Sequence, residues 1–155
     1  YITSHALRRL LELAPRPVLI VVMVQLEVAR RSVAGPPDMS LLAVSVQYYS
    51  RPEIVGRVPA GAFVPRPQVD SAILRMRPHQ APLFPDVPTD EFFRVASAGF
   101  RQKRKTLANS LAANLSIPKE AATLALQAAG VDPSARAERL TLEQWAALCR
   151  ALLAV

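Results

Sequence analysis

The chain has 155 residues, of which 51% are hydrophobic, a composition that excludes wholesale disorder and allows one ordinary domain or two small ones. Its single cysteine excludes an internal disulfide framework and fits a reducing compartment, and its two histidines, far apart in sequence, offer no metal cluster. The net charge of +7 favours a polyanionic partner such as RNA, DNA or an anionic membrane surface, and leaves open a basic surface without such a partner.

Residues 3–38 predict a helix, a strand and a second helix. The first helix covers 3–15, because a Thr-Ser pair can cap its start, leucines recur along it and a proline stops it. The continuous β-branched run "RPVLIVVMVQ" (16–25) predicts a central strand of a covered sheet, apolar on both faces. This run is far shorter than the roughly 20 residues that a membrane helix needs. With "LEVARRSVAGPPD" (26–38) as a helix that breaks at Gly-Pro-Pro, the order is typical of an α/β layer.

The next forty residues predict a hairpin, preceded by a segment of ambiguous structure. "LLAVSVQYY" (41–49) has the composition of a strand, but the spacing of its apolar residues also fits a helix. "EIVGRVP" (53–59) and "VDSAILRMRP" (69–78) are expected to pair as antiparallel strands through a long, proline-stiffened connection. Residues 78–88 contain four prolines and few apolar anchors, which favours a linker.

The remainder of the chain predicts a small all-α unit. One helix is expected over about 90–115, because apolar residues follow a single stripe from Phe93 to Leu115. A second is expected between a first-turn proline at 118 and a terminating glycine at 130. A third begins at the capping box "TLEQ" (141–144). Two residues near its start are expected to be core side chains: Trp145 and Cys149.

Positive charge is concentrated in "FRQKRKTLANSL" (100–111), inside a stretch from Arg94 to Pro118 that contains no acidic residue. On the predicted helix the four cations wrap around most of a turn and repel one another, so intrahelical pairing does not explain them. A phosphate-binding surface is therefore favoured over a merely solvated face, with a steep salt dependence and no base specificity. The four residues are Arg101, Lys103, Arg104 and Lys105.

The segment "FVPRPQVDSA" (63–72) places a large aromatic residue ahead of two prolines that fix φ and remove backbone donors. From the residues alone, Phe63 is expected to be an apolar plug under the hairpin rather than a ligand contact. Asp70 and Ser71, together with His79, are not expected to form a catalytic triad, since no nucleophile elbow or oxyanion motif surrounds them.

Together these stretches resemble the ribosomal RNA adenine N6-dimethyltransferase family of the bacterial KsgA type, also called RsmA. The likeness covers nearly the whole chain, and its last two motifs favour the ribosomal branch over the related antibiotic-resistance methylases. The family often has Tyr-Gly-Arg where this chain has Met39-Ser40-Leu41, and Lys where it has Leu26, which puts one basic contact in doubt. The matching stretches are "YITS" (1–4), "QLEVARR" with "VQYY" (25–49), "FVPRPQVDSA", "FRQKRKTLANSL" and "GVDPSARAERLTLEQW" (130–145).

The resemblance implies a mixed fold, α/β followed by all-α. Residues 1–79 would be the C-terminal portion of a Rossmann-like class I methyltransferase sheet, with 41–49 a helix, and 80–155 a helical rRNA-binding domain. Tyr1 resembles the last residue of the family's Asn-Leu-Pro-Tyr motif. The half that binds S-adenosyl-L-methionine would then precede this chain, leaving it without cofactor-binding residues of its own and inactive alone.

The same resemblance implies dimethylation of N6 of two adjacent adenines near the 3′ end of small-subunit (16S) rRNA, and a role in 30S ribosome biogenesis. Tyr1 and Phe63 would stack on the target adenine, which reverses the preference for an apolar plug. The implied partners are small-subunit rRNA and the pre-30S particle, for a cytoplasmic monomer that binds no metal or membrane. The alternative is a non-catalytic rRNA-binding assembly factor. A third possibility, an organellar transcription factor derived from this family, is disfavoured by the intact "RKTLANSL" and "DPSARAE".

Overall fold

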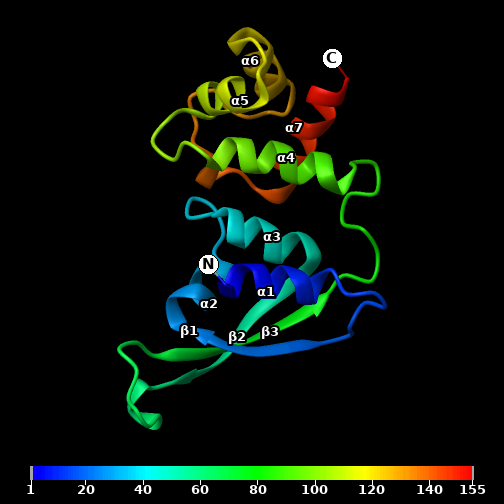
Figure 1. Ribbon diagram of the computed structural model, residues 1–155. Helices are drawn as coiled ribbons and strands as arrows, with labels where there is room; N and C mark the ends of the chain where they lie inside the picture. Colours follow the sequence, from blue (N-terminus) through cyan, green and yellow to red (C-terminus); the bar gives the residue numbers. More distant parts are fainter. Residues whose placement is uncertain (1, 155) are drawn as a thin grey trace. The chain divides into compact units, whose positions relative to one another are not determined.

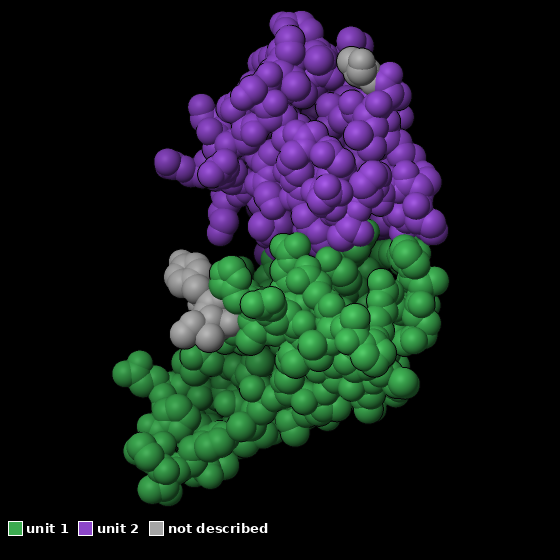
Figure 2. Space-filling view, turned by 45° about the vertical axis from the view of Figure 1, so that its right-hand side comes forward, with its two compact units in different colours: residues 1–34, 42–83 green, residues 35–41, 84–155 purple. Residues whose placement is uncertain are grey.

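The computed structural model describes residues 2–154 of the chain. Their contacts divide into two compact units, one formed by 2–34 with 42–83 and the other by 35–41 with 84–154 (Figure 2). The division therefore falls between Leu83 and Phe84, and the segment 35–41 is grouped with the helical second unit rather than with its neighbours in sequence.

The first unit is a three-stranded antiparallel sheet with helices on one face (Figure 1). The strand order is β1-β3-β2, so that β3 pairs with both neighbours. The predicted first helix, the hairpin and the helix at 41–49 are confirmed. In chain order the elements are α1 (Ile2–Leu11), β1 (Ile20–Gln25), α2 (Leu26–Val33), α3 (Leu41–Tyr49), β2 (Ser50–Val58), the 3₁₀ turn η1 (Ala60–Ala62) and β3 (Ser71–Pro78).

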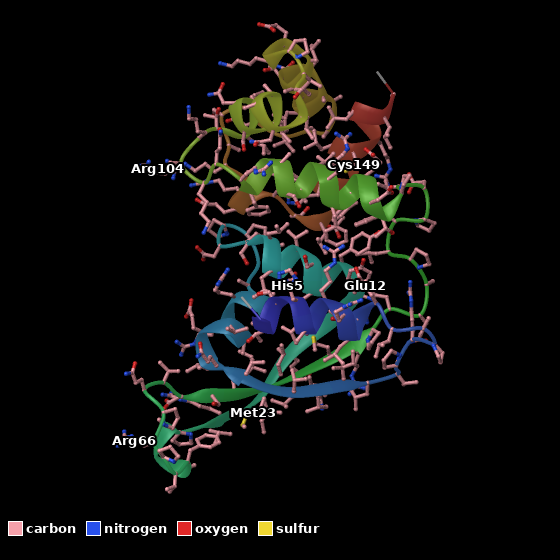
Figure 3. All side chains as sticks on the ribbon, in the orientation of Figure 1. His5, Glu12, Met23, Arg66, Arg104 and Cys149 are labelled. Carbon is pink, nitrogen blue, oxygen red and sulfur yellow. The ribbon has the colours of Figure 1, made fainter. Side chains whose placement is uncertain are left out.

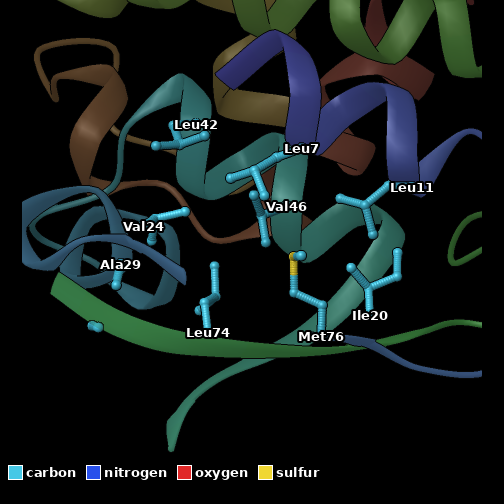
Figure 4. Packing of buried hydrophobic residues seen from close by; sticks show 10 residues of the cluster. Leu7, Leu11, Ile20, Val24, Ala29, Leu42, Val46, Leu74 and Met76 are labelled. Atoms are coloured by element: carbon cyan, nitrogen blue, oxygen red, sulfur yellow. The ribbon is translucent and has the colours of Figure 1, made fainter. Parts of the chain in front are cut away.

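Alternate residues of the sheet form its buried face. The register places Ile20 opposite Met76 and Val24 opposite Ala72, so both pairs lie on one side of the sheet. Figure 4 shows Ile20, Val24 and Met76 directed toward side chains of the covering helices, which bury them in one apolar cluster. The cluster consists of Leu7, Leu11, Ile20, Val24, Ala29, Leu42, Val46, Ala72, Leu74 and Met76.

The prediction that 16–25 is a central strand covered on both faces is wrong for the described sheet. β1 pairs only with β3, and its residues alternate between the buried face and an open face. On the open face Val21 is 53% exposed and Met23 54% exposed; Figure 3 shows Met23 on the side of the sheet away from α1. The continuous apolar run revealed two apolar faces, but only one of them is covered by this chain.

The second unit consists of helices, and most of its predicted features are confirmed. The capping box is present: the Thr141 hydroxyl accepts from the Gln144 amide at 3.2 Å, and the Gln144 side-chain oxygen accepts from the Thr141 amide at 3.0 Å. Trp145 and Cys149 are buried, as expected for core side chains. Its elements are α4 (Thr89–Phe100), α5 (Leu107–Leu115), α6 (Lys119–Ala128), the 3₁₀ turn η2 (Ala137–Arg139) and α7 (Leu142–Leu153).

The single helix expected over 90–115 is wrong, because the chain leaves the helix at 101–106 and restarts as α5. Phe100 and Leu107 are seven residues apart, a spacing that keeps an apolar stripe looking continuous across a break. The buried Ser110 hydroxyl donates to the carbonyls of Ala98 at 2.7 Å and Gly99 at 3.0 Å. These carbonyls belong to the last turn of α4, where partners within the helix run out, so Ser110 stabilises the end of α4.

Replacing Ser110 with alanine is expected to lower the free energy of unfolding by about 1–3 kcal/mol, because buried carbonyl oxygens lose a donor. Urea denaturation measures the effect. Thr123→Ala is the matched control, since the Thr123 hydroxyl also bonds a carbonyl, that of Lys119 at 2.9 Å, but at an exposed site. Equal denaturation midpoints for the two variants would contradict a role for Ser110 in holding the break.

Gly99→Ala is expected to destabilise the protein, against the helix preference for alanine of about 0.5–1 kcal/mol. A Cβ at this position would lie 2.5 Å from Cη2 of the buried Trp145 and 2.9 Å from Cδ1 of Leu107. Overpacking of this kind costs about 1–3 kcal/mol, which outweighs the propensity gain and should lower the urea midpoint. Gly35→Ala, which meets no atom within 4 Å, should leave the midpoint unchanged or raise it.

Candidate nucleic-acid interface

The connection between β2 and β3, residues 59–70, is called the hairpin loop and carries the aromatic candidate Phe63. It extends past the ends of the strands (Figure 1). Phe63 follows η1 in an extended conformation, φ −114° and ψ 148°, and its amide donates to the Ala60 carbonyl at 3.3 Å. Phe63 is partly exposed and is not a member of the buried cluster of the first unit, while its neighbour Val64 is fully exposed. Part of Phe63 is therefore accessible from solvent.

Asp70 closes the base of the hairpin loop. One carboxylate oxygen accepts from the backbone amide of Ala60 at 2.9 Å, and the other accepts two bonds from the guanidinium of Arg57, that from Nε at 2.9 Å. The Asp70 carbonyl also accepts from the Leu26 amide at 2.9 Å, at the start of α2. Asp70 therefore joins both ends of the hairpin loop and the helix that follows β1.

The same bonds fix the charge of Asp70. Its pKa is lowered, first by the Ala60 amide and then by the Arg57 guanidinium, both of which stabilise the carboxylate. A lowered folded-state pKa means that these bonds contribute stability above the ordinary pKa of an aspartate, and that this contribution is lost as pH falls through the folded value. At neutral pH Asp70 is ionised. From its sequence Asp70 was considered only as a member of a rejected triad, although an Asp and an Arg flanking a predicted hairpin connection are a reasonable cross-strand pair.

The four cations of the helical unit lie in the turn between α4 and α5, called the cationic segment (residues 101–105). The prediction that they wrap a helical turn is wrong; their clustering and exposure hold. Figure 3 shows Arg104 projecting from this turn. Within residues 2–154, none of the four forms an ion pair, so their charges are not neutralised by the described chain. They are Arg101, Lys103, Arg104 and Lys105.

The motif "DPSARAE" (132–138) contacts the start of α5, directly after the cationic segment. The amides of Leu107 and Ala108, the first two of the helix, donate to the carbonyls of Ala135 at 2.8 Å and Pro133 at 3.4 Å. These two first-turn donors are thus occupied, which leaves the exposed cationic side chains as the main anion-binding groups at this place. The exposed Arg136 follows Ala135 directly and extends the basic surface. Arg136 was not among the predicted phosphate-binding residues, although it lies in a motif that carries the family resemblance.

The motif "VQYY" has structural roles. The side-chain amide of Gln47 donates to the carbonyls of Ser32 at 3.1 Å and Ala34 at 2.8 Å, which satisfies the C-terminal end of α2. The Tyr49 hydroxyl donates to Glu12 at 3.1 Å, and Glu12 also pairs with Arg8 on α1. Burial, and then the negative charge of Glu12, raise the pKa of Tyr49 to about 12. Gln47 thus links α3 to the end of α2, and Tyr49 links α3 to Glu12 at the end of α1.

Tyr1, the other predicted stacking residue, lies outside the described residues. Across residues 2–154, no helix has the length and apolar character to cross a bilayer. The same residues contain no group of three or more His, Cys, Asp or Glu side chains that could hold a metal ion.

Solved structures define the class of fold. The 23S rRNA methyltransferase ErmE matches with a TM-score of 0.70 and 29% sequence identity, over 97% of this chain and 61% of that one. A dimethyladenosine transferase from Plasmodium falciparum matches with a TM-score of 0.77 over 95% of this chain and 61% of that one; at 22% identity it bears on fold alone. The fold is therefore that of part of an rRNA methyltransferase, an expectation of the sequence that is confirmed at this level.

Sequence comparisons give the family. The family model "Ribosomal RNA adenine dimethylase" matches residues 1–153. "Ribosomal RNA small subunit methyltransferase A" of Dehalococcoides mccartyi is 48% identical over 149 residues, and that of Halothermothrix orenii is 41% identical over 156 residues. The chain belongs to the ribosomal RNA adenine dimethylase family, as the resemblance implied. The two matches include 96% and 98% of this chain but only 51% and 52% of the relatives. The chain therefore spans about half the length of these relatives.

Proposed function

We propose that this chain is the C-terminal part of an enzyme that transfers methyl groups from S-adenosyl-L-methionine to N6 of two adjacent adenines near the 3′ end of small-subunit rRNA, during 30S biogenesis. The observation that carries the proposal is the family match over residues 1–153, together with the relatives' name, "Ribosomal RNA small subunit methyltransferase A". In this proposal the chain supplies both aromatic residues of an adenine clamp, Tyr1 and Phe63, and the surface that binds rRNA.

The open side of the sheet supports a further half of the methyltransferase domain. Among the described residues β1 has a strand partner on one edge only, and its outward side chains Val21 and Met23 are more than half exposed. Apolar surface of this kind is usually covered, and a sheet edge is usually paired or protected. A strand beside β1 and helices over the open face would complete a Rossmann-like sheet.

The junction of β1 and α2 does not fit the methyl donor. β1 runs directly into α2, from Gln25 to Leu26, without a glycine-rich turn that could approach a cofactor. S-adenosyl-L-methionine would be bound by the other half of the enzyme, where it would supply the sulfonium methyl group. The role of this chain is accordingly to bind and orient the rRNA.

The target atom explains why an aromatic clamp is needed. The lone pair of adenine N6 is delocalised into the ring, and the base is stacked with its neighbours until it is turned out of the helix. Holding the extruded base in line with the donor can supply on the order of 7–11 kcal/mol of the barrier. Phe63, partly accessible on the proline-stiffened hairpin loop, would stack on one face of the adenine, and Tyr1 on the other. Pro65 and Pro67 limit the backbone freedom that would be lost when the base binds.

The cationic segment and the neighbouring Arg136 would bind rRNA phosphates. Such interactions position an enzyme on its substrate without reading sequence, and selection of the adenines would then come from the shape of the rRNA and the clamp. The four unneutralised cations of the turn favour this assignment over a solvated surface, which usually intersperses acidic residues.

The alternative, a non-catalytic rRNA-binding assembly factor, is favoured by one observation: residues 2–154 include the cationic segment but no glycine-rich turn of the donor-binding kind. The two proposals differ in what precedes the chain in its reading frame. A methyltransferase requires a glycine-rich donor loop and a complete Asn-Leu-Pro-Tyr motif there, and a degraded motif would leave the assembly factor.

In the full-length protein, Phe63→Ala is expected to reduce the rate of methyl transfer to pre-30S particles by about 5- to 150-fold, since one stacked base is worth roughly 1–3 kcal/mol. Transfer of labelled methyl groups and particle binding are measured in parallel, and binding should stay nearly unchanged. Val64→Ala, at a fully exposed neighbouring position, is the matched control. Equal losses of transfer, binding and thermal stability would indicate that Phe63 is an apolar plug.

Neutralising the cationic segment is expected to weaken binding to pre-30S particles and to flatten its salt dependence. The slope of log K against log salt changes by about 0.7–0.9 for each phosphate that is no longer neutralised, so Arg104→Gln with Lys105→Gln should flatten it by up to about 1.8. The control pair is Arg30→Gln with Arg31→Gln, which removes the same charge from exposed positions on α2. Identical slopes for the two pairs would remove the cationic segment from the interface.

A further inference from the structure

We infer that Asp70 is a positioning residue for base stacking: by closing the base of the hairpin loop it holds Phe63 in the conformation that stacks on the target adenine. The inference rests on the proposed function, because it assigns to Asp70 the task of orienting the stacking residue. Its basis is the set of hydrogen bonds around Asp70, which connects to the Phe63 backbone through a single residue.

The Asp70 carboxylate is the main side-chain support of the loop. Each of its oxygens has a different partner: the Ala60 amide, at 2.9 Å, and the Arg57 guanidinium. Ala60 is the first residue of η1 and is 5% exposed, so it is a fixed point at the start of the loop. Asp70 is the last residue before β3, and the carboxylate thus binds the two ends of the loop to each other.

The linkage reaches Phe63 through Ala60. The Ala60 amide donates to Asp70, and the Ala60 carbonyl accepts from the Phe63 amide at 3.3 Å. The peptide units on either side of Ala60 therefore link the carboxylate to the aromatic residue. Beyond Phe63 the loop is exposed at Val64 and Arg66, so there it is constrained by the fixed φ angles of Pro65 and Pro67 rather than by packing. A displacement of Ala60 would consequently move Phe63, and a misplacement of about 1 Å at a reacting centre can cost roughly 100-fold in rate.

The two bonds of the carboxylate differ in what they contribute. Arg57 has a side chain that is 61% exposed, and ion pairs with such exposed partners contribute little. The bond to the Ala60 amide joins an ionised acceptor to a backbone donor of a buried residue, which makes it the stronger constraint. Loss of the whole carboxylate should therefore matter more than loss of its charge or of Arg57.

The test uses the full-length protein with pre-30S particles and S-adenosyl-L-methionine. Asp70→Ala is expected to lower kcat at least about tenfold with little change in KM, because the phosphate-binding cations of the second unit remain. Asp70→Asn keeps an oxygen for the Ala60 amide and should retain an intermediate rate, while Arg57→Ala should be closest to the unaltered protein. Glu53→Ala is the matched control: it removes a carboxylate that pairs with Arg75 on the same sheet and does not bond to the hairpin loop.

A double variant separates positioning from general stability. If Asp70 acts through Phe63, then Asp70→Ala combined with Phe63→Ala should be no slower than Phe63→Ala alone, because residues acting as a unit are not additive. Amide hydrogen exchange supplies a readout independent of activity: Ala60 and Phe63 should exchange faster in Asp70→Ala than in Glu53→Ala.

The outcomes separate the positioning role from its alternatives. Faster exchange with a kcat loss that disappears in the Phe63→Ala background supports the inference. Unchanged exchange at Ala60, additive losses in the double variant, or a kcat equal to that of the Glu53→Ala control would overturn it. A fully active Phe63→Ala protein would refute base stacking itself, and the positioning role with it, while the exchange data would still show whether Asp70 anchors the loop.

Discussion

The arrangement of the first unit depends on the central position of β3. This strand pairs with both β1 and β2, and its alternate residues Ala72, Leu74 and Met76 are fully buried beneath the helices. Because β2 and β3 are antiparallel, the chain between them must reverse beyond the sheet, where no helix covers it. The same pairing fixes where β3 begins, and therefore where Asp70 stands in relation to the start of the loop. The pairing of β3 with its two neighbours thus determines both the packing of the core and the geometry of the hairpin loop.

The second unit places its clustered positive charges, at 101–105, in a turn between two helices. A continuous helix from 90 to 115 would hold the cations of 101–105 on adjacent turns, with like charges at neighbouring positions. The turn between α4 and α5 releases them from helical geometry, and the cost of ending α4 is offset by the Ser110 hydroxyl on its last carbonyls. Segment 133–135 then satisfies the first amides of α5. The exposed turn between α4 and α5 therefore depends on Ser110 and on segment 133–135, which is distant from it in sequence.

Local patterns predicted what depends on local forces. The capping box at Thr141, the glycine that follows α6 with φ +69°, and the core positions of Trp145 and Cys149 were all evident, because each needs only neighbouring residues or apolar character. The errors concern partners elsewhere in the chain. The apolar stripe from Phe93 to Leu115 continues across the break between α4 and α5, which the Ser110 hydroxyl stabilises. The apolar sequence of β1 does not indicate which of its two faces this chain covers.

The candidate site divides in the same way. The cationic segment can be recognised in the sequence as a run of positive charges. Phe63 received its proposed role only through the family resemblance, because the sequence around it favoured an apolar plug. Asp70 was discounted because no catalytic pattern surrounded it. Its bonds to Arg57 and Ala60 depend on the closure of the hairpin, which places residues ten or more positions apart within hydrogen-bond distance. A sequence pattern predicts the strands of a hairpin more readily than the hydrogen bonds at its neck.

The burial of Cys149 has a practical consequence for studying motion. It is the only cysteine of the chain, it is 1% exposed, and burial raises the pKa of its thiol to about 12, so it stays protonated and shielded at neutral pH. The native surface of this chain therefore offers no reactive sulfhydryl to a thiol-directed probe. A cysteine introduced at the fully exposed Val64 would carry a spin label or fluorophore beside Phe63 without removal of the natural one, and would report how far the hairpin loop moves when rRNA binds.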